Sequence, residues 1–155
     1  MIIIRKRIVF SRNDKTKLCI ILLSLIVFIA SLTQTAFTYD DYDGVKTHSS
    51  ISLLIMGGIV VVGGGLLEWF IWLANPLYLF GLFYFYTNNR KCIYFLVSAS
   101  ILSLSFTTWN EILAAENGRL ATIKSLELGY WLWVISILVS TIAIAIFKIR
   151  HKVDK

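Results

Sequence analysis

The amino-acid sequence predicts an integral membrane protein built from helices, and three observations lead to this class. Hydrophobic residues make up 57% of the 155-residue chain and charged residues only 15%, whereas soluble domains carry about 25% charged residues. Several apolar runs of 17 or more residues are long enough to cross a bilayer as helices. The charges are concentrated in short segments beside these runs, where they indicate topology rather than a soluble surface.

The hydropathy pattern predicts an all-α bundle of four transmembrane helices. The first apolar run follows a long basic flank and spans about 20 residues, which exceeds the core of a cleaved signal peptide and predicts an uncleaved anchor. The predicted spans are 18–37, 70–87, 92–108 and 129–147, with outer loops 38–49 and 109–128 and basic cytoplasmic ends 1–17 and 148–155.

The topology depends on residues 50–87, which hold one charge, Glu68, and one proline, Pro76. This run is too long for one crossing and slightly short for two. A single crossing places 12 Lys and Arg residues on one side and 3 on the other, whereas two crossings give 8 against 7. The positive-inside rule favours the single crossing, with both termini in the cytoplasm.

Glycines indicate that part of this run does not belong to the membrane-crossing helix. Five glycines interrupt its first half, and each weakens a helix by about 1 kcal/mol. We therefore expect residues 50–67 to form a half-helix or re-entrant element in the outer leaflet, with its turn packed against the other helices. The glycines expected at this packing surface are Gly57, Gly58, Gly63, Gly64 and Gly65.

Two polar residues in this run are candidates for function. Glu68 lies either hydrated at the outer interface or buried, where it would titrate or bind a partner. Pro76 frees the backbone carbonyl near Trp72. Asn75 and this carbonyl therefore mark either a packing kink or a polar site.

Two further residue patterns indicate membrane anchoring and helix packing. Aromatic side chains near the outer ends of the second and fourth spans predict an interfacial belt formed by Trp69, Trp72, Tyr130, Trp131 and Trp133. Small residues four positions apart allow close approach of helices, within one chain or in an oligomer. These residues are Ala99 and Ser103 in the third span, and Ser136 and Ser140 in the fourth.

The two outer loops carry weaker signals. Asp40, Asp41, Asp43 and His48 indicate a solvated acidic loop rather than a cation site, because the spacing lacks the glycine and terminal glutamate of a calcium-binding loop. Thr108 and Glu111 match a capping box, which predicts a short surface helix over about 109–116. Leu120, Ile123 and Leu126 then recur at three-residue steps, which indicates an amphipathic connector or lid along the interface.

Composition and motifs exclude several classes of function. The net charge of +6 lies in the flanks of the spans, so we expect no binding of nucleic acid. The sequence contains none of the common catalytic, phosphate-binding or metal-binding motifs. We therefore expect no enzyme activity, no cofactor and no metal.

Three sequence strings resemble a known pattern. They are Trp-Leu-Ala-Asn-Pro at 72–76, Ser-Leu-Ser-Phe at 103–106 and Gly-Tyr-Trp-Leu-Trp at 129–133. With these strings, residues 50–147 resemble small uncharacterised multi-span inner-membrane proteins of Gram-negative bacteria, which have no assigned activity. The resemblance implies a location in the bacterial inner membrane and the number of helices.

Two functional hypotheses follow. The first is a non-enzymatic binding or accessory protein of the inner membrane that contacts the lipid bilayer and another membrane protein or a second copy of itself; a toxin-immunity protein is one concrete form. The second is a subunit of an oligomeric channel or transporter with a polar path through Glu68 and Asn75.

Overall fold

The computed structural model describes residues 12–42, 44–114 and 118–153. The protein is mostly helical, as predicted, and three of its helical segments are long and apolar enough to cross a membrane. It also contains a four-stranded sheet. The predicted all-α class is therefore wrong, because the connections between α1 and α2 and between α5 and α6 form strands.

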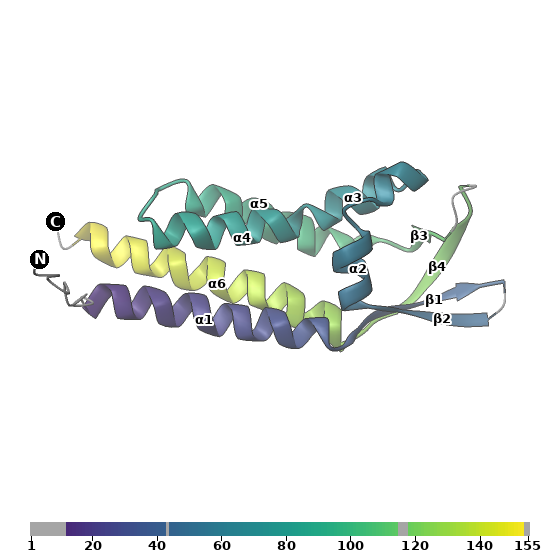
Figure 1. The fold of residues 1–155 in the computed structure, drawn as a ribbon, viewed down its shortest axis with the longest axis horizontal. Coiled ribbons are helices and arrows are strands. Elements are labelled where there is room, and N and C mark those ends of the chain that lie inside the picture. The colour runs from purple at the N-terminus through teal and green to yellow at the C-terminus, as the bar shows by residue number, and fades with distance from the viewer. Residues whose placement is uncertain (1–11, 43, 115–117, 154–155) are drawn as a thin grey trace, which may run out of the picture.

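Four helices form an elongated bundle. They are α1 (Arg12–Leu32), α4 (Ala74–Tyr86), α5 (Cys92–Ser105) and α6 (Leu128–Val153). Helix α1 packs along α6, α4 packs along α5, and α5 also contacts α6. The start of α1, the turn between α4 and α5, and the end of α6 lie at one end of the bundle, and the sheet lies at the other (Figure 1).

The three long apolar segments are Asp14–Leu32, Leu66–Tyr86 and Leu128–Arg150. Helix α5 and the short 3-10 helix η2 (Phe106–Thr108) together form an apolar helix, Cys92–Thr108, that is shorter than these three. Fully buried side chains from three helices, such as Tyr78, Leu96 and Ile137, form the centre of the bundle.

The turn between α4 and α5 gathers basic side chains at the bundle end opposite the sheet. Asn88 adopts a left-handed conformation (φ 60°), which ends α4 and lets the Asn89 N–H donate to the Tyr84 carbonyl over 2.8 Å. The Lys17 amine donates to the Asn88 side chain, and the Lys148 amine donates to the Asn89 carbonyl over 3.0 Å. Basic residues far apart in the sequence therefore meet here.

The sheet closes the opposite end. Its strands are β1 (Thr35–Asp41), β2 (Gly44–Ser49), β3 (Glu111–Leu113) and β4 (Leu120–Leu126), all antiparallel in the order β2-β1-β4-β3. Helix α1 ends at Leu32, earlier than the predicted end of the first span at residue 37. The chain leaves the helix because Thr35–Asp41 is rich in β-branched and aromatic residues, and Phe37 and Tyr39 are buried in the sheet.

The segment predicted as an amphipathic connector is strand β4, which contains a β-bulge. Phe37 lies opposite Leu126 and Tyr39 lies opposite Ile123, with a register shift between Thr38 and Tyr39. One extra residue in β4 therefore brings Ile123 and Leu126 to the same face of the sheet.

The predicted surface helix over 109–116 is also wrong over the described residues, because Glu111–Leu113 is a strand. The Thr108 hydroxyl donates to the Ser105 carbonyl over 2.8 Å. It thus completes the helix before it rather than capping one after it.

The glycine-rich region begins with a short helix at the sheet end of the bundle. Helix α2 (Ser50–Met56) is capped by the Ser49 hydroxyl and is followed by one 3-10 turn, η1 (Val60–Gly63). Gly64 then turns the chain with a φ of +91°. Helix α3 (Leu66–Trp72) leads almost directly into α4. The depth of residues 50–67 in a membrane stays a prediction.

Candidate functional site: a cavity beneath the sheet

A cavity of about 390 Å³ lies where the bundle meets the sheet. Its wall combines the end of α1, strands β1, β2 and β3, the region from α2 to α4, and the start of α6. Most of the lining is apolar. The polar side chains in it come from Ser31, His48, Ser50, Ser52, Glu68 and Asn75, beside the aromatic residues Phe37, Trp72, Phe106, Tyr130 and Trp133.

Asn75 is buried, and both the nitrogen and the oxygen of its side-chain amide form hydrogen bonds. Its Nδ2 donates to the Trp72 carbonyl over 2.9 Å, and its Oδ1 accepts from the Trp133 indole N–H over 2.9 Å. The Trp72 carbonyl is the acceptor that Pro76 leaves free, because proline has no N–H to donate one turn later. Asn75 therefore repairs the break in the helix and ties α4 to α6.

Trp72 holds α2 across the cavity. Its indole N–H donates to the Leu54 carbonyl over 2.8 Å, which satisfies one of the open acceptors at the end of α2. Gly57 makes this contact possible, because a side chain there would collide with the Trp72 ring. The hydrogen bonds from Leu54 through Trp72 and Asn75 to Trp133 thus link four helices, α2, α3, α4 and α6.

Glu68 is half-buried in the first turn of α3 and lines the same cavity. Its Oε1 accepts the Leu113 backbone N–H over 2.8 Å, so the carboxylate joins α3 to strand β3. Glu68 and Asn75 thus share one cavity wall, although each uses its hydrogen bonds to join structural elements. A path for ions through them stays a prediction.

Ser50 differs from the other polar residues of the lining. Its side chain is buried, with 8% of the residue exposed, and Oγ has no hydrogen-bond partner among the described residues. The hydroxyl lies against Gly129, where a side chain would leave it no room. An unpaired buried hydroxyl is costly, so Ser50 is the group in this cavity that a bound polar atom would satisfy.

His48 packs between the aromatic residues of β1. Its ring stacks on Tyr39 with centroids 4.9 Å apart and meets the edge of Phe37 at 5.2 Å. Burial lowers the pKa of His48 below its ordinary value of 6.5, because the charged imidazolium would lose water. The imidazole is therefore neutral at pH 7 and offers one donor and one acceptor near the cavity.

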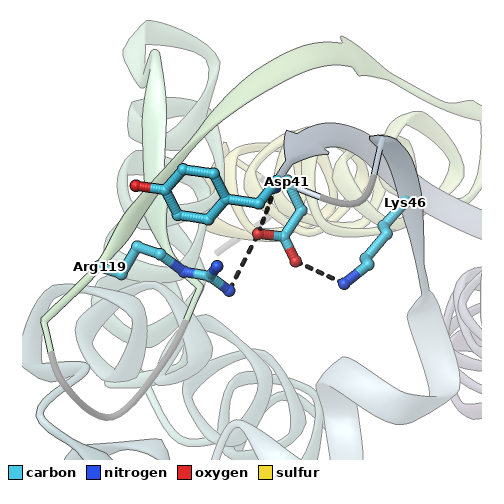
Figure 2. Close-up of polar contacts among 4 residues, drawn as sticks. Asp41, Lys46 and Arg119 are labelled. Atoms are coloured by element: carbon cyan, nitrogen blue, oxygen red, sulfur yellow. Dashed lines mark hydrogen bonds and ion pairs between the residues drawn. The ribbon is translucent and has the colours of Figure 1, made fainter.

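The acidic loop forms an ion-pair cluster at the tip of the β1–β2 hairpin. Asp41 pairs with Lys46 over 2.5 Å and with Arg119 over 2.9 Å (Figure 2). The hydrogen bond from Lys46 and that from the Tyr42 N–H, with the charge of Arg119, lower the pKa of Asp41. Asp40 pairs with Lys124 over 3.0 Å. Among described residues no group of three or more metal-ligating side chains gathers, and Asp43 lies outside them.

The predicted aromatic residues lie near the sheet end. Tyr130 is buried and its hydroxyl donates to the Ser103 carbonyl over 2.7 Å, whereas Trp131 is 43% exposed. Trp69 is half-buried and packs edge-on against Phe70, with ring centroids 5.7 Å apart. Trp72 and Trp133 turn inward to the cavity. The role of the five residues as membrane anchors stays a prediction.

The small residues lie inside the bundle. Ala99 and Ser103 are 0% exposed, and Ser136 and Ser140 are 1% exposed. Among the five glycines, Gly57 and Gly58 face the Trp72 ring, Gly65 adjoins Val60, and Gly63 and Gly64 belong to the turn before α3.

Sequence reasoning missed Ser50 and considered His48 only as a metal ligand. No local pattern distinguishes Ser50 from its neighbours, because the cavity exists only after the sheet has folded over the bundle. The Asn75-Pro76 pair was the signal that did lead to this region.

Comparisons with protein-family profiles, with curated proteins and with solved structures found no match.

Proposed function

We propose that this chain crosses the bacterial inner membrane four times, with the sheet on the outer side and both termini in the cytoplasm. Within that membrane it acts as a non-enzymatic binding protein. Its binding site is the cavity beneath the sheet.

Geometry and charge support four crossings. Cys92–Thr108 is 17 residues long, at the lower limit of about 17–25 residues for a spanning helix. The start of α1 and the end of α6 lie at one end of the bundle, which requires an even number of crossings (Figure 1). That end also carries Lys17, Lys91 and Lys148, as expected on the cytoplasmic side.

The exposed apolar surface of the region from α2 to α3 supports the placement of the sheet end of the bundle at the outer leaflet. Exposed apolar side chains recur along its sequence from Ile51 to Phe70. A large exposed apolar surface marks contact with a membrane or a partner. The most exposed of these residues are Ile55 (66%), Ile59 (60%), Val62 (89%) and Leu67 (63%).

The cavity is the single observation that most supports the proposed binding function. Its volume of about 390 Å³ lies within the range of about 300–1,000 Å³ found for ligand sites, which are mostly apolar with a few placed polar groups. Hydrogen bonds at Asn75, Trp72 and Glu68 hold its walls in place. This arrangement suits binding, since the polar groups of the wall are committed to structure rather than to proton transfer.

Photolabelling with a small apolar aryl diazirine tests this role. We expect the purified protein in lipid nanodiscs to be labelled at cavity residues such as Leu53 and Ile112. Ile71→Trp places an indole in the cavity and should abolish this labelling. Leu67→Trp adds the same ring on the exposed side of α3 and should leave it unchanged. Equal labelling of the two variants would reject the cavity as a binding site.

Cysteine labelling in intact cells tests the topology. In a background where the exposed Cys19 is replaced by serine, an impermeant maleimide should modify Tyr42→Cys, at the hairpin tip. It should not modify Asn89→Cys, in the turn between α4 and α5. Modification of Asn89→Cys alone would invert the proposed orientation.

A toxin-immunity protein is the concrete form of this role that we propose to test first. In that case the gene lies beside a toxin gene, and its deletion sensitises the cell to that toxin. An unrelated gene neighbourhood would argue against the immunity role and would leave the binding role intact.

A further inference from the structure

We infer that the cavity binds a single alkyl chain of a neutral amphiphile, and that the polar end of this ligand hydrogen-bonds to the hydroxyl of Ser50. The inference rests on the proposed binding function and specifies its ligand by size, polarity and charge. Each of these three properties follows from a separate feature of the cavity.

The cavity volume sets the size of the ligand. A volume of about 390 Å³ corresponds to about a dozen water-sized groups at roughly 30 Å³ each. One alkyl chain of about ten to twelve carbons fills this space. The second chain of a phospholipid exceeds this volume and would lie outside the cavity. A much shorter chain leaves part of the apolar lining without contacts.

Ser50 indicates that the ligand has a polar end. The serines inside the bundle bond to backbone carbonyls, for example Ser31 to Phe28 over 2.6 Å and Ser140 to Ile137 over 2.8 Å. Ser50 lies in the first turn of α2, where no carbonyl one turn earlier belongs to the helix. Ser50 lines the cavity, and its Oγ is buried without a partner among the described residues. A ligand oxygen or nitrogen at this point would receive or donate the missing hydrogen bond.

The surrounding charges favour a neutral polar end. Glu68 carries the one formal charge among the described residues that line the cavity, and its carboxylate already accepts the Leu113 N–H. His48 is neutral at pH 7 because burial lowers its pKa. A free carboxylate or a phosphate would therefore find no opposite charge, whereas a hydroxyl, an ester or an amide needs none.

Met56 indicates where such a ligand enters. It lines the cavity and is also 55% exposed, so its side chain lies where the cavity meets the outer surface of α2. The neighbouring Ile55 and Ile59 are exposed as well. An alkyl chain that reaches this edge from an apolar surrounding stays in contact with apolar side chains on its way in.

A competition assay in nanodiscs tests the inference. The probe is a monoacylglycerol with a dodecanoyl chain that carries a diazirine near its terminal carbon. The competitors are dodecanol, dodecanoate, dodecane and butanol. We expect dodecanol to compete best, dodecanoate to compete poorly, and butanol to have no effect. Equal competition by dodecanol and dodecanoate would overturn the assignment of a neutral polar end.

Serine variants test the hydrogen bond. Ser50→Ala should weaken competition by dodecanol about three- to tenfold, which is the range for a hydrogen bond between neutral groups, and should leave dodecane unchanged. Ser140→Ala is the matched control, because Ser140 is also buried but is not among the cavity residues, and its hydroxyl donates to the Ile137 carbonyl. If both variants bind dodecanol as the wild type does, Ser50 does not hold the polar end.

The apolar diazirine separates this inference from the proposed function. If it labels the cavity but no amphiphile competes, the ligand class is wrong and the binding role stands. If it labels nothing in the cavity, the binding role itself fails. A peptide with a dodecanoyl group attached as an amide tests the source of the chain, because it competes only if the site accepts an acylated partner as well as a free lipid.

Discussion

Buried serines in the interior of the bundle and Ser50 in the cavity at its sheet end differ in their hydrogen bonding. Within the bundle, buried serines hydrogen-bond to backbone carbonyls, as Ser103 does to Ser100 over 3.0 Å and Ser140 to Ile137 over 2.8 Å. In the cavity, the buried Ser50 has no partner among the described residues. Polar groups that are all hydrogen-bonded stabilise the fold, whereas a polar group without a partner in the cavity wall is available to a ligand.

The largest effect is expected at Asn75, on the boundary between these two regions. Asn75→Leu leaves the Trp133 indole N–H and the Trp72 carbonyl without partners, and should lower the free energy of unfolding by about 2–4 kcal/mol. Denaturation in mixed micelles measures this loss.

Ser140→Ala is the control for Asn75→Leu, because it removes one hydroxyl bonded within its own helix. It should cost less than about 1 kcal/mol. If the two variants are equally stable, Asn75 does not join the helices as described.

The next effect concerns the packing of α2 on Trp72. Gly57→Ala places a methyl group against the Trp72 ring and should destabilise the cavity wall by about 1–3 kcal/mol. Gly58→Ala meets the same ring at 3.1 Å and should cost less. Thermal unfolding of the two variants gives the order, and the reverse order would contradict the placement of the indole.

A smaller effect is expected from His48. Its pKa is lowered in the folded protein, so folding disfavours the protonated form. The stability of the sheet is therefore complete above about pH 6.5, the usual pKa of histidine, and falls as the pH drops below that value. Hydrogen exchange of β1 and β2 between pH 7 and pH 5 measures this, and His48→Phe should remove the dependence. A dependence that persists in His48→Phe would assign it to another group.

The smallest effect is expected at Asp41, whose ion pairs lie at the hairpin tip. Its pKa is lowered, so its contribution is present above the usual pKa of 3.8 and is lost as the pH falls through the lower value in the folded protein. Limited digestion of the hairpin with an acid-active protease should become faster over that interval. Asp41→Asn should be digested at a rate that no longer changes there, and the cavity should still bind its probe.

The sequence predicts the bundle and the sheet to different degrees. Hydropathy identifies the long apolar helices, because a spanning segment must bury its backbone polar groups within itself. The strands are short, and the two hairpins join into one sheet through β1 and β4, which lie more than 80 residues apart, as the Thr38–Ser125 pair shows. The bulge in β4 also imitates a helical period at Ile123 and Leu126, so local pattern alone suggests the wrong element.

The candidate site is predictable only in part for the same reason. Asn75-Pro76 is a local signal, since a proline within a helix always frees a carbonyl. Ser50 has no such signal. Its isolation depends on the packing of α2 against the start of α6, where its hydroxyl lies against Gly129.

A high-resolution structure of the protein in lipid nanodiscs tests the central claim most directly. The account predicts one elongated density inside the cavity, with a polar end within hydrogen-bonding distance of Ser50 Oγ. A cavity that holds only ordered water, or that has closed on its own side chains, would contradict it.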